Sequence, residues 1–411
     1  MQLIMSLIGM AVLIGLALLL SDNRKAIKLR TVGGAFAIQV CFGAFVLYVP
    51  FGQSVLESIS GAVSNIIIYA NDGIGFLFGD LARFKVGFIF AINVLPIIIF
   101  FSALISVLYY LGVMQKVVNI LGGALQKALG TSRTESLSAT ANIFVGQTEA
   151  PLVVKPFIAK MTNSELFAIM VGGLASVAGS VLAGYAGLGI ELKYLIAASF
   201  MAAPGGLMMA KIIKPETEVP QDQAADIVED EADKPANVLD AAATGASGGM
   251  RLAANVGAML IAFIALIAMI NGMIGGIAGW FGMENLTLQV ILGYVFAPLA
   301  WVIGVPWAEA TQAGSLIGQK IIVNEFVAYI DFIGMKETLS AHTQAIVIFA
   351  LCGFANLSSI AILLGGLGSL APSRRGDIAR MGLKAVAAGS LSNLMSAAIA
   401  GFFLTLLAYS A

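Results

Sequence analysis

A short polar segment interrupts the apolar sequence and reads Gly146-Gln147-Thr148-Glu149-Ala150-Pro151. It sets an amide, a hydroxyl and a carboxylate side by side between a glycine and a proline. In hydrocarbon, each unpaired polar group raises the free energy by several kcal/mol. The segment must therefore face protein or a water-filled cavity, and polar interruptions of this kind are where transporters bind substrates and coupling ions.

The composition around this segment is that of a polytopic helical membrane protein. Of the 411 residues, 59% are hydrophobic and only 11% are charged, and the mean hydropathy is +0.95, well above the range of soluble domains. The 22 basic and 23 acidic residues leave a net charge of −1, which excludes a nucleic-acid-binding protein. Cys41 and Cys352 lie in apolar runs, where we expect small buried hydrophobes and neither a disulfide nor a metal pair.

Eight apolar runs are long enough to cross a bilayer, which takes about 20 residues. The first has no basic residues before it and is followed by Arg24 and Lys25, the order expected of an uncleaved span and not of a signal peptide. Eight spans place both termini on one side of the membrane. The runs are 3–20, 33–50, 88–112, 165–187, 192–211, 252–278, 344–370 and 382–408.

Basic residues in the connecting loops orient these spans. Four clusters follow the first, third and fifth spans or precede the last, so all four fall on one face. Positively charged loops face the cytoplasm, which predicts an inner-membrane protein with both termini outside. The clusters are Arg24, Lys25, Lys28 and Arg30; Lys127 and Arg133; Lys211 and Lys214; and Arg374, Arg375 and Arg380.

Two other segments are not typical of spans. Apolar residues between Val55 and Ile67 recur at helical spacing and predict an amphipathic helix, either at the membrane interface or packed under the bundle. Region 215–249 is acidic and contains three prolines. It is predicted to be a solvated cytoplasmic linker that divides the chain into halves.

Two segments are too polar or too interrupted for full spans, and each is predicted to form a re-entrant helical hairpin. The first covers 116–162 around the polar segment quoted above, and the second covers 284–330 around Gly304–Ala310. A span broken by glycines and small polar residues follows each hairpin, with the breaks at 172–180 and 352–359. The first hairpin begins on the cytoplasmic side and the second outside, so the two units are inverted. We expect the substrate between the hairpin tips and the broken spans.

Three side chains of the second half have chemistry suited to a sugar, and a fourth suits a flat ring. Glu325 lies just past the second hairpin tip in an apolar environment, and its carboxylate can accept two hydrogen bonds from a vicinal diol. Asn356 and Ser359 are three residues apart and share one helix face, so they can complete a polar cradle. Phe354 offers a flat face to a heteroaromatic ring, although a lone aromatic residue more often belongs to a core.

The tip of the first hairpin has chemistry suited to a base. Gln147 and Thr148 combine donors with acceptors, as the edge of a base requires, and Glu149 can contribute directly or through water. Capping and closure of the hairpin would also account for the threonine and the glutamate. Two acidic residues at depth, Glu149 and Glu325, together with Gln147, argue against a purely structural role.

Helix breaks also free backbone carbonyl oxygens for binding a cation. With a serine hydroxyl they form a hard-oxygen set that suits an alkali cation and not zinc. In the first half, the carbonyl groups near Asn142 and Val145, the hydroxyl of Ser176 and the carbonyl of Val177 are candidate ligands.

Other functional classes are less consistent with the sequence. An intramembrane hydrolase would need a nucleophile and base, a carboxylate pair or a metal cluster, yet the chain has one histidine, His342, near a span end. An open channel is a weaker hypothesis than a transporter, because two inverted units with closed hairpins suit alternating access. Among transport mechanisms, proton coupling through a carboxylate competes with sodium coupling, and the oxygen set favours sodium.

At this point the sequence resembles the concentrative nucleoside transporter family, close to its bacterial sodium-coupled members. The resemblance extends over essentially the whole chain. It is carried by Leu29-Arg30-Thr31-Val32-Gly33-Gly34-Ala35-Phe36, Phe100-Phe101-Ser102-Ala103-Leu104-Ile105, Gly146–Pro151, Asn324-Glu325-Phe326-Val327 and Gly353–Ser359. The loop at Gly79–Val86 looks shorter than in similar bacterial sequences.

The resemblance implies a non-enzymatic homotrimer that imports nucleosides with sodium by an elevator mechanism. Gln147, Thr148, Glu149 and Val181 would contact the nucleobase with Phe354 packed on it, while Glu325, Asn356 and Ser359 would hold the ribose. Asn142, Val145, Ser176 and Val177 would form the sodium site. The implied division is a scaffold at 1–113 and 250–282, a transport domain at 114–214 and 283–411, and the acidic linker at 215–249.

Overall fold

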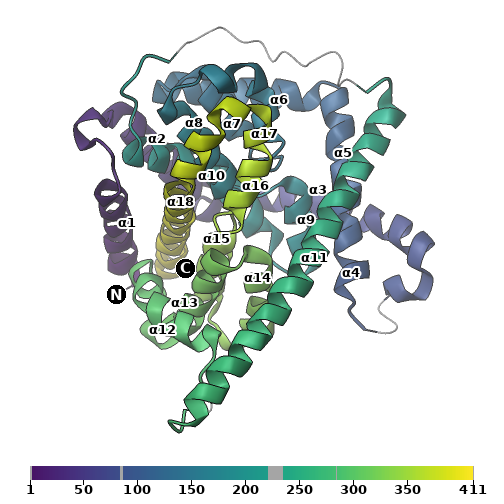
Figure 1. Cartoon of the computed structure of the whole chain (residues 1–411), viewed down its shortest axis with the longest axis vertical. Helices are drawn as coiled ribbons and strands as arrows, with labels where there is room; N and C mark the ends of the chain where they lie inside the picture. Colours follow the sequence, from purple (N-terminus) through teal and green to yellow (C-terminus); the bar gives the residue numbers. More distant parts are fainter. Residues whose placement is uncertain (1, 84–86, 221–234, 284, 411) are drawn as a thin grey trace.

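The computed structural model describes residues 2–83, 87–220, 235–283 and 285–410, and every regular element in these ranges is a helix (Figure 1). The first half contains α1 (Gln2–Leu19), α2 (Leu29–Leu47), α3 (Pro50–Phe78), α4 (Phe90–Asn93), α5 (Leu95–Tyr110), α6 (Val113–Leu129), α7 (Arg133–Ala141), the 3-10 segment η3 (Ala150–Lys160), α8 (Asn163–Ala175), α9 (Gly179–Gly187) and α10 (Leu192–Ile213). The second contains α11 (Val238–Gly279), α12 (Leu288–Val302), α13 (Trp307–Ile322), α14 (Glu325–Met335), α15 (Ala341–Leu351), α16 (Ser359–Gly365), α17 (Leu367–Leu370) and α18 (Arg375–Ser410).

The predicted membrane character is confirmed by the helix lengths. Within the described residues, seven helical segments are long and apolar enough to cross a bilayer. The remaining predicted span, 344–370, is present as α15 followed by α16 and α17, which are separate short apolar helices. The predicted amphipathic helix is longer than expected, because α3 runs over 29 residues.

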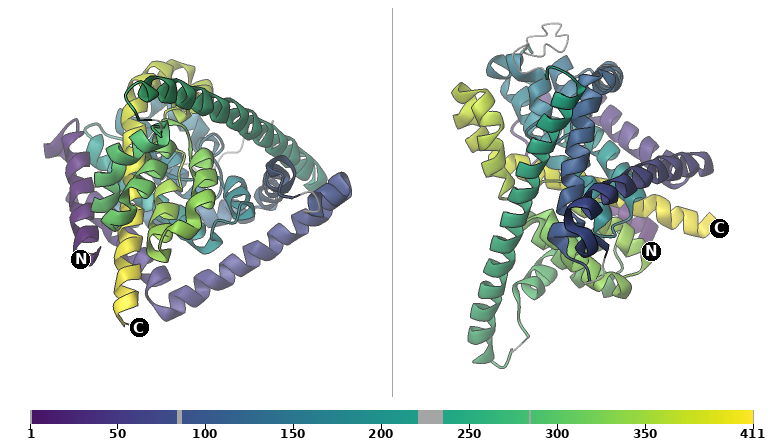
Figure 2. Two further views of the ribbon diagram at one scale, coloured as in Figure 1. Left: turned by 90° about the horizontal axis from the view of Figure 1, so that it is seen from below. Right: turned by 90° about the vertical axis from the view of Figure 1, so that its right-hand side faces the viewer.

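The broken spans lie at the centre of the molecule. In the apolar 18-residue stretch of α8 with α9, and in that of α10, 94% of the residues are buried, whereas only 22% are buried in that of α11. Figure 2 shows α3 and α11 running along the outside of the molecule. The interrupted helices are therefore surrounded by protein, which is where unpaired backbone groups can find partners.

The order of elements occurs twice, as predicted. The series α5, α6, α7 with η3, α8 with α9, and α10 in the first half corresponds to α11, α12, α13 with α14, α15 with α16, and α18 in the second. The first elements of the two series, α5 and α11, pack closely against each other. The first hairpin proper is α7 and η3, while the start of its predicted range belongs to the separate helix α6.

The predicted tip of the second hairpin is wrong in position. Gly304, at φ +111°, lies in the bend between α12 and α13, which meet at 116°. The turn that reaches the central pocket is instead Val323-Asn324, where the Asn324 side chain accepts a hydrogen bond from the Val327 N–H (2.9 Å) and caps α14. The prediction followed the glycine and proline of the sharper bend, because a single asparagine cap is a weaker turn signal in the sequence. His342 lies at the outer bend, 3.3 Å from the Gly304 carbonyl oxygen.

Two further expectations need correction. The predicted linker 215–249 ends too late, because α11 begins at Val238 with Asn237 as its cap, and residues 221–234 lie outside the described residues. Cys352 is buried as predicted, but Cys41 is exposed on α2. An apolar run cannot distinguish a face that contacts protein from one that faces outward in a membrane helix.

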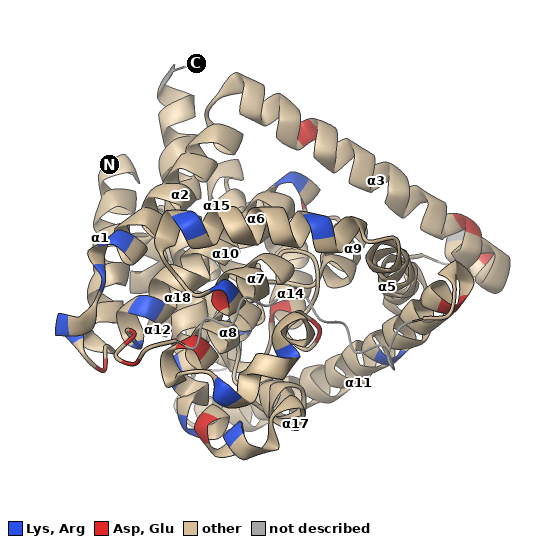
Figure 3. Cartoon of the chain, turned by 90° about the horizontal axis from the view of Figure 1, so that it is seen from above, with Lys and Arg blue, Asp and Glu red and all other residues tan. Residues whose placement is uncertain are grey.

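The predicted basic clusters gather at one end of the molecule (Figure 3). Asp22, in the loop after α1, pairs with Lys214 (3.0 Å) and with Lys384. Burial disfavours ionisation of Asp22, but the hydrogen bonds from the two lysines outweigh it, so the pKa of this carboxyl lies below its usual value. Arg30 donates to the Lys127 carbonyl oxygen (3.0 Å), so these loops share one face, as the charge pattern predicted.

Small residues permit the close packing of α5 and α11. Gly245 and Gly249 of α11 face Ser102 and Ser106 of α5, and the Ser106 hydroxyl donates to the Ala241 carbonyl oxygen (2.8 Å). A Cβ atom on Gly249 would lie 2.7 Å from the Ser102 Cβ and 2.8 Å from the Ile99 Cα. This is the small-residue spacing that brings membrane helices into contact.

We expect Gly249→Ala to destabilise the protein, because the added methyl group must push the two helices apart. The cost of such overpacking is about 1–3 kcal/mol, measured as a lower thermal midpoint in detergent. Gly248→Ala is the matched control, since a Cβ atom there would meet nothing within 4 Å. Equal midpoints for the two variants would contradict the close packing.

Candidate functional site

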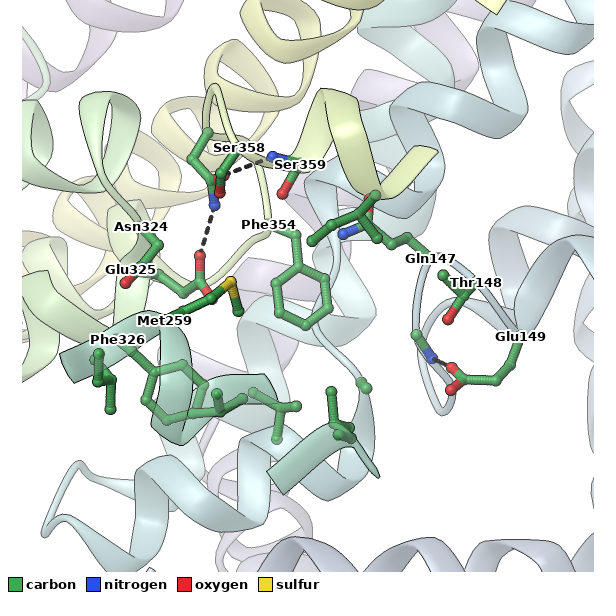
Figure 4. A pocket seen from close by; sticks show the side chains of 18 residues that line it. Gln147, Thr148, Glu149, Met259, Asn324, Glu325, Phe326, Phe354, Ser358 and Ser359 are labelled. Carbon is green, nitrogen blue, oxygen red and sulfur yellow. Dashed lines mark hydrogen bonds between the residues drawn. The ribbon is translucent and has the colours of Figure 1, made fainter. Parts of the chain in front are cut away.

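A central pocket lies where the two hairpin tips meet the two helix breaks, and it encloses about 660 Å³ of empty space, part of it open to the outside (Figure 4). All eight side chains predicted to bind substrate line it. They come from the first hairpin tip, from α9, from the start of α14 and from the break between α15 and α16: Gln147, Thr148, Glu149, Val181, Glu325, Phe354, Asn356 and Ser359.

The first hairpin tip is closed by its own polar groups. The Glu149 carboxylate accepts the Gly146 N–H at 2.6 Å, so part of its function is the structural capping considered from the sequence. The tip is fastened to the broken span by the Gly179 N–H, which donates to the Phe144 carbonyl oxygen (2.9 Å). Gln147 is 5% exposed, and within the described part of the chain its Oε1 atom has no hydrogen-bond partner. That acceptor remains free for a ligand donor.

Glu325 is held in place from both repeats. Its Oε1 atom accepts the Tyr185 hydroxyl (3.1 Å) from α9, and its Oε2 atom accepts the Asn356 amide (3.0 Å). The Asn356 Oδ1 atom accepts the Ser358 hydroxyl (2.7 Å) and the Ser359 N–H (2.9 Å). Each carboxylate oxygen has further lone-pair capacity, so Glu325 is oriented and can still accept ligand hydroxyl groups.

The Phe354 ring projects into the pocket between the two polar groups of residues. Figure 4 shows it with Glu325 on one side and the Gln147-Thr148 tip on the other. Its backbone N–H donates to the Ser176 carbonyl oxygen (3.1 Å), which joins the break of the second repeat to the break of the first. A flat ligand between the hairpins would therefore contact a ring whose backbone is fixed.

The four predicted cation ligands lie together at the first hairpin and the first break. All are buried, and the Asn142 amide nitrogen, which donates to the Ser138 carbonyl oxygen (2.9 Å), lies against Gly172 of α8. The Asn142 Oδ1 and Ser176 Oγ atoms are buried and have no hydrogen-bond partner among the described residues. Neutral oxygen donors fit a hard monovalent cation, and an oxygen bound to an ion would not be left unsatisfied. The residues present, with Val145 and Val177 beside them, thus fit sodium.

Sequence reasoning missed two parts of the site. Tyr185, which orients Glu325, lies in an apolar segment, and only its position just after the predicted break could have indicated it. The other is an apolar wall supplied by α11, which a uniformly hydrophobic span gives no means of recognising. Its residues are Leu252, Val256, Met259 and Leu260.

Family comparisons match nearly the whole chain. Residues 8–81 match the N-terminal part and residues 194–401 the C-terminal part of the Na+ dependent nucleoside transporters, and residues 91–191 match a gate domain described as nucleoside recognition. The three matches include every predicted site residue up to Ser359. The matched family consists of transporters, so this chain is a transport protein and not an enzyme.

Relatives match nearly the full length of this chain. The chain is 53% identical to nucleoside permease NupC of Helicobacter pylori, covering 98% of each chain, and 37% identical to sodium/nucleoside cotransporter 1 of Sus scrofa, covering 96% of this chain and 63% of that one. A solved structure of CNTnw in an inward-facing substrate-bound state matches with a TM-score of 0.95 and 62% identity, covering 99% of each chain. The chain thus belongs to the sodium-dependent nucleoside transporter family and is a polytopic membrane transporter of nucleosides.

Proposed function

We propose that this protein imports nucleosides by sodium symport. The observation that carries the proposal is the adjacency of two unlike sites. At the first helix break lie buried oxygen atoms with no partner in the described ranges, and in the neighbouring pocket an oriented carboxylate lies beside a projecting ring. The Ser176–Phe354 backbone hydrogen bond joins them directly. Proton coupling is the alternative.

In this proposal the pocket divides the nucleoside between the two repeats. The free acceptor of Gln147, with Thr148 and Glu149, faces the base edge, and Val181 and Phe354 pack on the base. Glu325 accepts hydrogen bonds from the ribose hydroxyl groups, and Asn356 and Ser359 can donate to them or accept from them. The support is chemical, since the polar groups of the second repeat are concentrated around one carboxylate.

Sodium, when bound to Asn142, Val145, Ser176 and Val177, supplies a positive charge that orders the first hairpin tip against the broken span. The tip residues are then in position for the nucleobase, which raises nucleoside affinity. Thermodynamic linkage requires the converse effect of nucleoside on sodium affinity.

We further propose an elevator mechanism in which the hairpins and broken spans move against a scaffold within a homotrimer. The packing supports a scaffold of α3, α5 and α11, with α1 and α2 assigned to the moving part and not to the scaffold as the resemblance first suggested. The reason is that α2 packs more extensively on α10 than on α3, and α1 packs on α18. Asp22 also pairs with Lys214 at the end of α10 and with Lys384 of α18. A fixed α1–α2 pair would have to break these contacts.

The charge distribution supports an orientation in the inner membrane. The face that carries the Asp22, Arg30 and Lys214 loops would be cytoplasmic, since positively charged loops remain inside. Both termini would then lie outside, and the segment after Lys214 would be cytoplasmic.

The coupling ion is tested by radiolabelled uridine uptake into proteoliposomes under an inward sodium gradient or an inward proton gradient. We expect the sodium gradient alone to drive uptake, and Ser176→Ala to reduce it because a buried ligand oxygen is lost. Ser54→Ala, on α3 away from the pocket, serves as the control. Uptake driven only by protons would overturn sodium coupling, and no nucleoside uptake under either gradient would overturn the function.

Glu325→Gln tests the ribose assignment. We expect uridine binding to weaken by roughly 10- to 100-fold, because hydrogen bonds to a charged group contribute about 1.5–3 kcal/mol. Binding of 2′,3′-dideoxyuridine should change much less, since it lacks the hydroxyl donors. Affinities are measured by calorimetry with Glu337→Gln, an exposed site on the same half, as the control. Equal weakening of both ligands would refute the assignment.

Tyr185→Phe tests whether the hydroxyl orients Glu325. Removing one hydrogen bond should weaken uridine binding by roughly three- to tenfold, or about 1 kcal/mol, with little effect on the dideoxy analogue. Tyr194→Phe removes a hydroxyl from α10 outside the pocket and should leave the uridine dissociation constant unchanged. A wild-type dissociation constant in the Tyr185 variant would contradict this role.

A further inference from the structure

The two helix breaks meet at a single side chain of α18. The Asn393 amide nitrogen donates to the Ala175 carbonyl oxygen (2.7 Å) at the end of α8 and to the Cys352 carbonyl oxygen (2.9 Å) at the end of α15. The contact is close, since a Cβ atom on Gly353 would lie 2.3 Å from the Asn393 Oδ1 atom. One buried amide therefore pairs a freed carbonyl from each repeat.

A buried lysine determines which way this amide points. Lys320 of α13 is 2% exposed, and its ammonium group donates to the Asn393 Oδ1 atom (2.7 Å). An ammonium group can only donate, so the amide oxygen must face Lys320 and the amide nitrogen must face the two carbonyl groups. In the opposite orientation, the amide oxygen would meet two carbonyl oxygens and the amide nitrogen would meet a cation.

The two carbonyl groups lie beside the two binding sites. Ala175 immediately precedes Ser176 of the cation site, and Cys352 is two residues before Phe354 and four before Asn356 of the pocket. Neither Lys320 nor Asn393 is among the residues that line the pocket. The pair therefore touches no ligand directly: it acts through the backbone that it holds, beside the electrostatic attraction between Lys320 and Glu325.

We propose that Lys320 and Asn393 are positioning residues that couple the sodium site to the nucleoside site. When a cation draws the Ser176 segment toward the first hairpin, the shared amide transmits the shift to the segment that carries Phe354 and Asn356. The Ser176–Phe354 backbone bond runs parallel to this link, but only the amide link depends on side chains. The inference rests on the proposed sodium-coupled transport.

The test measures the uridine dissociation constant of purified protein at saturating NaCl and in choline chloride. The ratio of the two constants is the coupling factor, commonly about 5- to 150-fold in proteins. Lys320→Met keeps the volume of the side chain but removes the donor, and should reduce the coupling factor at least about fivefold, chiefly by weakening binding in sodium. Gly353→Ala keeps both polar partners but displaces the amide, and should lower the factor as well.

Lys211→Met is the matched control. Lys211 is also a buried lysine, 6% exposed and paired with Glu135, but it lies at the cytoplasmic ends of α7 and α10, away from the breaks. Its loss should lower thermal stability and leave the coupling factor unchanged. A wild-type factor in folded Lys320→Met or Gly353→Ala protein, or an equal reduction in Lys211→Met, would overturn the inference. A coupling factor of one in the unaltered protein would instead refute sodium coupling itself.

Discussion

A helix broken inside a bilayer leaves carbonyl and N–H groups that hydrocarbon cannot satisfy, and the arrangement of this protein follows from how those groups are paired. Both breaks are placed in the buried centre, where α18 crosses them. Asn393 pairs a carbonyl group of each, and the Phe354 N–H pairs with Ser176. The surrounding α10 and α18 are needed to bring these partners into reach. The same packing that forms the core therefore also holds the backbone of the binding pocket.

The two repeats satisfy their polar atoms differently. In the second, Glu325 accepts hydrogen bonds from Asn356 and from Tyr185 of the first repeat, and Lys320 donates a hydrogen bond to Asn393. In the first, Asn142 and Ser176 keep buried oxygen atoms that no described residue pairs with. A cation bound in the first repeat would therefore satisfy oxygen atoms that are otherwise unpaired. The groups proposed for the ribose, in the second repeat, are already ordered by their own hydrogen bonds. Inverted symmetry of the fold does not require symmetry of the chemistry.

Much of this was predictable because the membrane limits the choices. Apolar run length identified the spans, and the polar residues within them identified six of the eight pocket side chains, since polar groups at depth need a functional or structural partner. Phe354 was identified by its place beside the polar residues of the second break, and Val181 only by the family resemblance. The second hairpin turn was misplaced because Gly304 and Pro306 are stronger turn formers than Asn324. Tyr185, Lys320 and Asn393 needed the structure: which residues meet across 73 positions of sequence, as Lys320 and Asn393 do, depends on tertiary packing that periodicity does not encode.

The apolar wall of the pocket has a mechanical consequence. The α11 residues Leu252, Val256, Met259 and Leu260 contribute only hydrocarbon and a thioether to the lining, whereas every hydrogen-bonding group belongs to the hairpins and broken spans. If these elements slide along α11, no hydrogen bond between the ligand and the wall has to rupture at any point of the path. The wall would then offer the ligand only apolar contacts, which can be exchanged continuously as the elements move. In the proposed motion, resistance at α11 would then come from the shape of the side chains alone, and a single serine or asparagine in the wall would add a hydrogen bond that the motion has to break.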